Sequence, residues 1–246
     1  MSDITRIFRL EVTRVFRSRR YGYLLLISLL LMAYSLSLWD GGLSGTAPFA
    51  APSIGKLFSL NGSIWACATI LLCRELHSEK ELAARRILLS APVSTARYFA
   101  PKLAVVLAAI LTIVLAFFLS TAGYFHVVFG VLPLAAMLEA FLIFSVPSLL
   151  FTAGLSMLLG RIHGSVLYAL CTIVFLVGML NLPFPLWADL FGNWLYVDIG
   201  FIISLREYAG QALILFLPGE FLWGRAAFAV LGLAGIGFGC SRRLPG

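Results

Sequence analysis

The sequence predicts an all-α membrane protein with six transmembrane helices, an N-terminal interfacial helix, and a re-entrant helix pair between the fifth and sixth spans. Of its 246 residues, 61% are hydrophobic and 12% are charged, whereas soluble domains are about half apolar and about a quarter charged. The apolar residues form long runs, and the basic residues gather in short runs beside them. This composition excludes an ordinary soluble enzyme and leaves too little chain outside the bilayer for a separate ATPase, protease or nucleic-acid-binding domain. Residues 1–246 are therefore expected to form a single transmembrane domain.

Residues 1–20 predict a basic amphipathic helix that lies in the membrane interface. The apolar residues recur at intervals of three and four, which places them on one helical face. Arginines occupy much of the opposite side, as is typical of interfacial helices; they are Arg6, Arg9, Arg14, Arg17, Arg19 and Arg20. The alternative is a disordered basic leader.

The transmembrane spans are predicted from long apolar runs. Crossing about 30 Å of hydrocarbon at about 1.5 Å per residue takes roughly 20 residues. Residues 21–38 form the first such run, and because residues 36–40 offer no small-residue cleavage site, we expect an uncleaved anchor. The other spans are expected at 54–73, 103–122, 132–159, 165–182 and 225–240.

The basic residues predict the orientation of the chain. With six spans, both termini lie on one side, and all but three of the 18 Lys and Arg residues fall on that side. The exceptions are Lys56, Arg206 and Arg225. Because positively charged loops stay in the cytoplasm, both termini are expected there, in a membrane of the bacterial inner, or cytoplasmic, type. The net charge of +7 is explained by this bias, so nucleic acid is not an expected partner.

Residues 183–224 predict a re-entrant segment on the outer side. Residues 199–217 are apolar enough to suggest a seventh span, but Arg206 and Glu207 lie at their middle. Burying both at the bilayer centre would cost several kcal/mol. A helix pair that dips into the membrane and turns at these two residues keeps them near water and satisfies the backbone of each half. The two residues could gate an outer exit or only neutralise each other, and an ordinary surface loop is the structural alternative.

The most polar stretch, residues 74–102, predicts a short rigid helix between the second and third spans. Ser78 followed by Glu81 matches a capping box, and acids near the start of a helix suit its dipole, as arginines suit its later part. Pro92 ends this helix. A partner that gripped it would move both attached spans; the candidate contact residues are Ser78, Glu79, Glu81, Arg85 and Arg86. The alternative is a solvated loop that only sets the topology.

This loop resembles the one between the second and third spans of ABC-2 type transporter permeases. The resemblance rests on the acid-rich turn, the short helix, and the run Leu88-Leu89-Ser90-Ala91-Pro92-Val93-Ser94, with Lys102 opening the next span. The interfacial helix, the six spans, the cytoplasmic termini and the re-entrant helices extend it over the whole chain. One departure is Ala83-Ala84, where the family often has a Gly-Thr pair.

The resemblance implies a subunit of an ATP-driven transporter, more often an exporter in this family, whose loop 74–102 contains a coupling helix that docks on an ATP-binding subunit. The chain lacks the G-x-x-x-x-G-K-[ST] motif, so ATP and Mg²⁺ are expected on a separate partner, and neither a cofactor nor a catalytic residue is expected here. Six spans are half of what the family uses, so a second permease chain, identical or different, is expected. Gly235 and Gly239 could form a close-packing face for it, or could pack within the chain.

Glu139 lies inside the fourth predicted span, and an ionisable residue there is a hypothesis for a transport pathway or gate. The alternative is that it pairs with Lys56 or Arg225 near the outer interface. The three histidines are scattered, and the four cysteines lie within or beside apolar runs. No metal site and no disulfide framework are therefore expected.

Three other functions remain open. An intramembrane enzyme would need Ser120 with His126, or Ser145 with Glu139. A non-transporting assembly or signalling protein would use an ATPase only mechanically, and a haem-exporter-like permease is a rival within the transporter class. The sparse intramembrane charge argues for an amphipathic or lipid-linked substrate, or for no cargo, over a small ion.

Overall fold

The computed structural model describes residues 3–40, 51–78, 81, 95–130, 132–180, 182–198 and 217–241. Within these ranges the chain is helical, with turns between the helices and no strand, which confirms the all-α prediction. The elements are α1 (Asp3–Phe16), α2 (Arg19–Asp40), α3 (Ala51–Glu75), α5 (Thr95–Phe129), α6 (Leu134–Ala140), η1 (Phe141–Ser145), α7 (Val146–Leu159), α8 (Val166–Met179), η2 (Leu186–Ala188), α9 (Asn193–Asp198) and α11 (Gly219–Ser241).

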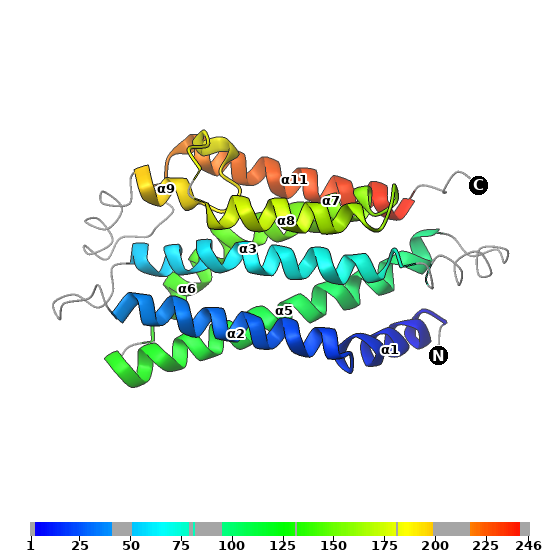
Figure 1. The fold of residues 1–246 in the computed structure, drawn as a ribbon, viewed down its shortest axis with the longest axis horizontal. Helices are drawn as coiled ribbons and strands as arrows, with labels where there is room; N and C mark the ends of the chain where they lie inside the picture. The colour runs from blue at the N-terminus through cyan, green and yellow to red at the C-terminus, as the bar shows by residue number, and fades with distance from the viewer. Residues whose placement is uncertain are drawn as a thin grey trace.

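The helices form one elongated bundle in which successive long helices run in opposite directions (Figure 1). The helix α1 and the last turns of α11 lie at one end, which we call the α1 end, and α9 lies at the other, the α9 end (Figure 1). Among the described residues, four helical stretches are long and apolar enough to cross a membrane; they are Ile54–Glu75, Tyr98–Val127, Leu134–Leu159 and Gly219–Cys240. The protein is thus a membrane-embedded helical bundle. The first and fifth predicted spans lie on α2 and on α8, which has 14 residues.

The largest differences between the helices and the predicted spans are at α5 and α11. The helix α5 extends well beyond residues 103–122 and includes residues 123–129, which the sequence predicts as a connection. Hydropathy marks the part of a helix that suits lipid, whereas the helix itself continues until the backbone must turn. Here that happens at Gly130, whose φ of +72° is in the left-handed region that favours glycine. The helix α11 likewise begins at Gly219, ahead of the predicted start at Arg225.

The helix α3 is at the centre of the bundle, where it contacts α2, α5, α7 and α8. Its Phe58 and Trp65 pack edge-on against Phe117 of α5, with ring centroids 5.4 and 4.8 Å apart. All three side chains are fully buried. The Trp65 indole N–H donates to the Ser28 hydroxyl of α2 at 3.2 Å, so its buried polar group is satisfied. This aromatic core fixes α2, α3 and α5 relative to one another.

Glycines bring α7 and α11 into close contact. A Cβ atom added at Gly154 would lie 2.3 Å from the Gly232 carbonyl oxygen, and one added at Gly232 would lie 2.4 Å from the carbonyl of Leu150. A Cβ at Gly235 would lie 3.0 Å from the Gly154 backbone, and one at Gly239 would lie 2.9 Å from the side chain of Met157 on α7. Of the two interpretations of the glycine-rich last span, the structure therefore supports packing within the chain.

Replacing Gly232 by Ala is expected to lower the midpoint of thermal unfolding in detergent. The added methyl group would overlap the α7 backbone and force the two helices apart, and overpacking of this kind costs about 1–3 kcal/mol or more. Gly237→Ala is the matched control, because a Cβ there meets no atom within 4 Å and Ala is the better helix former. Equal midpoints for the two variants would contradict the close contact.

The fourth predicted span contains one irregular turn. Residues Phe141–Ser145 form the π-helical turn η1, and the Val146 N–H bonds to the Phe141 carbonyl. Pro147 follows directly; it lacks an N–H and would crowd the carbonyl four residues earlier in a regular helix. The wider turn accommodates the proline, so the helical stretch runs unbroken from Leu134 to Leu159.

Candidate functional site

Two acidic and two basic side chains meet at the α1 end; we call them the charged cluster (Glu11, Arg14, Glu81 and Lys102). The Lys102 ammonium donates to Glu11 at 2.7 Å and also to Glu81. The Arg14 guanidinium donates to the other Glu81 oxygen at 3.1 Å and lies 3.5 Å from Glu11. Glu81 and Lys102 are buried, and the cluster is electrically balanced.

Three separate segments supply the charged cluster. Glu11 and Arg14 lie three residues apart on α1 and so share one face. Tyr98 and Lys102 lie on successive turns of α5; the Tyr98 hydroxyl donates to Glu81, and the Lys102 ammonium lies 4.7 Å from the centroid of the Tyr98 ring. Glu81 belongs to the predicted coupling segment and accepts hydrogen bonds from both helices. A displacement of Glu81 would therefore pull on α1 and α5 together.

The surroundings of Glu81 favour its ionised form. Burial alone raises the pKa of this carboxyl, but hydrogen bonds from Lys102, Tyr98 and Arg14 and the charge of Lys102 outweigh that effect and hold the pKa below its usual range. A carboxyl with a lowered folded-state pKa stabilises the fold above the usual pKa of about 4.3. It loses that contribution as the pH falls through the folded-state pKa.

Glu81→Gln is therefore expected to lower the midpoint of thermal unfolding at pH 7, and the difference from the wild type is expected to shrink as the pH falls below about 4. Hydrogen bonds to a charged group contribute about 1.5–3 kcal/mol, which sets the size of the effect at pH 7. The measurement is a pH series of unfolding midpoints for both chains. A difference that stayed constant over the series would contradict an ionised Glu81.

The structure describes two of the five predicted coupling residues. Ser78 lies just beyond α3, where its N–H bonds to the Glu75 carbonyl at 3.4 Å, and Glu81 lies in the charged cluster. The other three, Glu79, Arg85 and Arg86, lie outside the described residues.

The structure also describes one of the three predicted pathway residues. Glu139 is half-buried on α6. Arg206 and Glu207 lie outside the described residues, as does the whole of 199–216 within the predicted re-entrant segment.

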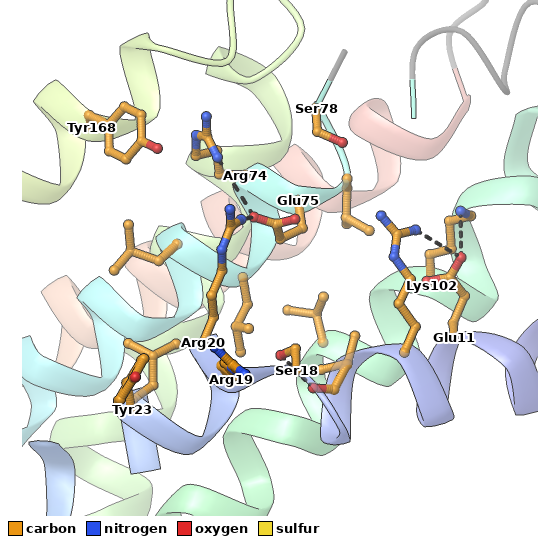
Figure 2. A pocket seen from close by; sticks show the side chains of 17 residues that line it. Glu11, Ser18, Arg19, Arg20, Tyr23, Arg74, Glu75, Ser78, Lys102 and Tyr168 are labelled. Carbon is orange, nitrogen blue, oxygen red and sulfur yellow. Dashed lines mark hydrogen bonds and ion pairs between the residues drawn. The ribbon is translucent and has the colours of Figure 1, made fainter. Parts of the chain in front are cut away.

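A cavity of about 910 Å³ lies beside the charged cluster. Besides cluster residues, its wall includes Arg19 and Arg20 of α2, Arg74 and Glu75 of α3, and Tyr168 of α8. Arg20 and Arg74 both approach the Glu75 carboxylate, as Figure 2 shows, and Arg74 Nη1 lies 3.6 Å from it. The Arg74 guanidinium carbon lies 4.4 Å from the centroid of the Tyr168 ring. The volume is within the range of about 300–1,000 Å³ that is usual for small-ligand sites.

At the α9 end, Arg225 of α11 holds residues 182–198 against the bundle. It is buried, although the sequence predicts it as an outer-interface charge. Its guanidinium donates to the Asp189 carbonyl at 2.7 Å, to the Leu190 carbonyl, and to the Ser148 hydroxyl of α7 at 3.2 Å. Arg225 thus joins α11, α7 and the connecting segment in one set of hydrogen bonds.

The Asp189 side chain fixes the fold of this segment. Its carboxylate accepts the N–H groups of Gly192 and Leu195 at 2.8 and 3.0 Å, which is how an acidic residue caps a helix start. Gly192 has a φ of +83°, which favours glycine. Asn193 then donates to the Gly178 carbonyl of α8 at 2.6 Å, so the segment is inserted among the helices by polar contacts.

The described residues hold no group of three His, Cys, Asp or Glu side chains that could bind a metal ion, and the four cysteines are free thiols. What the charged cluster offers is a set of ion pairs that can exchange partners when a helix moves. Sequence reasoning missed Glu11, Arg14 and Tyr98 as parts of this site.

Comparison of the chain with models of protein families, with curated proteins and with solved structures finds no match. The fold and the site define a class: a membrane-embedded helical bundle with an ion-pair cluster at one end and an inserted polar segment at the other.

Proposed function

We propose that the chain is the permease subunit of an ATP-driven transporter of the ABC-2 type, and that residues 74–102 couple it to a separate ATP-binding subunit. The observation that carries the proposal is the position of Glu81. Glu81 lies in the proposed coupling segment and accepts hydrogen bonds both from α1 and from the start of α5. A partner that moved the segment would therefore move the interfacial helix and a membrane-crossing helix together.

The proposal includes a finer topology. The chain crosses the membrane six times, with α2 and α8 as the first and fifth spans, and the residues between α8 and α11, 183–218, form a re-entrant segment on the outer side. Both termini and the charged cluster lie on the cytoplasmic side of a bacterial-type inner membrane. Two such chains pair to form the path, ATP and Mg²⁺ bind the partner, and the direction is export. The alternating directions of the long helices support this topology (Figure 1).

The test is an affinity pull-down of the full chain from gently solubilised native membranes, with the copurifying proteins identified by mass spectrometry. We expect an ATPase with a Walker motif, and a second permease if the pair is not of identical chains. Recovery without an ATPase, under conditions that preserve a known ABC transporter, would refute the proposal.

A second experiment separates a permease from an intramembrane enzyme. Reversing the charge of Glu79 and Arg86 is expected to abolish stimulation of the partner ATPase while the chain remains in the membrane. An enzyme that acts on its own would keep its activity in the same variant.

A further inference from the structure

We propose that the cavity at the α1 end binds the phosphate group of an anionic phospholipid. This site goes beyond the proposed transport function. It rests on the proposed topology, with the bundle in a membrane and the α1 end on the cytoplasmic side, and it does not depend on an ATPase partner.

The first argument is the charge of the cavity wall. The charged cluster neutralises itself, because its two acids pair with its two bases. Outside the cluster, the described wall has one carboxylate, that of Glu75, which pairs with Arg20 and Arg74, and three arginines, since Arg19 also lines it. This part of the wall therefore carries net positive charge, which stabilises an anion.

The second argument is the unused bonding capacity of Arg74. Its Nε atom is buried and has no hydrogen-bond partner among the described residues, which is an unfavourable arrangement in a native protein. The Tyr168 ring packs against one side of the Arg74 guanidinium. The Glu75 carboxylate pairs with only one of the guanidinium nitrogens, Nη1. Arginine presents a fork of N–H groups that matches a phosphate with two parallel hydrogen bonds.

The third argument is the apolar remainder of the wall, which favours a lipid over a soluble phosphate. This part is made by Val15, Leu24, Leu71, Leu72, Leu76 and Val106. A free phosphate ion gains nothing from such a surface, whereas the glycerol and first methylene groups of a lipid would be removed from water there. Tyr23, also on the wall and 62% exposed, is of the residue type that lies at headgroup level.

The fourth argument is the place of the cavity in the fold. It lies where α1 turns into α2, which is the level at which an interfacial helix meets a span. Basic pockets between helices on the cytoplasmic side attract anionic headgroups, because that leaflet has a negative surface potential. The cavity volume is large enough for a headgroup.

The test is native mass spectrometry of the full chain, with its copurified partners, in neutral detergent titrated with phosphatidylglycerol or phosphatidylcholine. We expect phosphatidylglycerol to bind more tightly. The double variant R19Q/R20Q is expected to weaken that binding about tenfold, as the loss of one charge-assisted hydrogen bond would, and it leaves Glu75 paired with Arg74. The matched control R9Q/R17Q also removes two exposed arginines, but neither lines the cavity, so its binding is expected to be unchanged.

The proposal would be overturned by equal binding of the two lipids, or by an equal loss in the cavity variant and the control. Should R19Q/R20Q fail to fold, Arg74→Gln gives the same test and leaves Glu75 paired with Arg20. In a separate experiment, inorganic phosphate or glycerol 3-phosphate is added to the chain and the midpoint of thermal unfolding is measured. The opposing result is that one of these two phosphates stabilises the wild type at the concentration at which the lipid binds, and fails to stabilise R19Q/R20Q. That result would show that the cavity binds a soluble phosphate and would overturn the proposal of a lipid.

Discussion

Glu81→Ala is expected to reduce both the stability of the bundle and its coupling to the partner ATPase. The change leaves Arg14 and Lys102 with Glu11 as their one remaining acid in the charged cluster, and breaking a buried ion pair costs about 3–5 kcal/mol. Because Glu81 is the residue at which the proposed coupling segment meets α1 and α5, stimulation of the ATPase is expected to fall about tenfold or more. That is the scale of a coupling free energy of about 1–3 kcal/mol. The measurements are the unfolding midpoint and the ATPase rate of the assembled complex.

A double variant separates the ion pair from a general loss of structure. In Glu81→Gln with Lys102→Met, the cluster is again electrically balanced, so the loss of stability is expected to be smaller than the sum of the two single losses. Glu220→Ala, at an exposed acid on α11, is the control for removing one negative charge. A Glu81→Ala chain that is less stable but still couples normally would show that the cluster only holds the helices together.

Arg225→Met is expected to release residues 182–198 from the bundle. The variant loses three hydrogen bonds at once and leaves the buried Asp189 carboxylate without the positive charge that attracts it. A buried acceptor left without its donor costs about 1–3 kcal/mol, and Arg225→Met leaves the Asp189 and Leu190 carbonyls without theirs. Hydrogen exchange localises the effect: the amides of Gly192 and Leu195, which bond to Asp189, are expected to exchange much faster than in the wild type.

Arg225→Lys is the conservative comparison. Lysine keeps the charge but lacks the planar fork that reaches several acceptors, so a stability between the wild type and Arg225→Met is expected. Unchanged exchange at residues 189–195 in Arg225→Met would contradict the anchoring role of Arg225.

The positions of the membrane helices could be predicted because hydropathy is a local property. The runs at 54–73, 103–122 and 225–240 lie within stretches that are apolar and long enough to cross, and the run at 132–159 begins two residues before another such stretch, Leu134–Leu159. The ends could not be predicted in the same way. A helix continues past the lipid until a residue such as Gly130 turns the backbone, and hydropathy carries no signal for that position.

The sites at both ends were harder to predict because they join residues far apart in the sequence. Arg225 begins the last apolar run, which is typical of an interfacial charge, but the helix starts earlier, at Gly219. Arg225 therefore lies within the helix and faces the connecting segment. For the charged cluster there is a usable signal: a lysine at the edge of a strongly apolar span, such as Lys102, is costly to bury unless it has an acidic partner. The sequence does not show that the partners are Glu11 and Glu81.

The π-helical turn at residues 141–145 is one residue longer than a regular helical turn, so it changes the register of the membrane-crossing stretch Leu134–Leu159. Each residue of a regular helix advances the chain by about 100° around the axis, so deleting one residue of α7 between Ser148 and Gly154 would turn one of these two residues away from its neighbours. A deletion within η1 would instead let the wide turn close to ordinary α-helical geometry, at the cost of crowding by Pro147. The faces of α6 and α7 would keep their directions. A deletion within η1 is therefore expected to keep the contacts of α7 with α3 and α11 but to place Pro147 inside a regular helix, which costs about 3 kcal/mol or more.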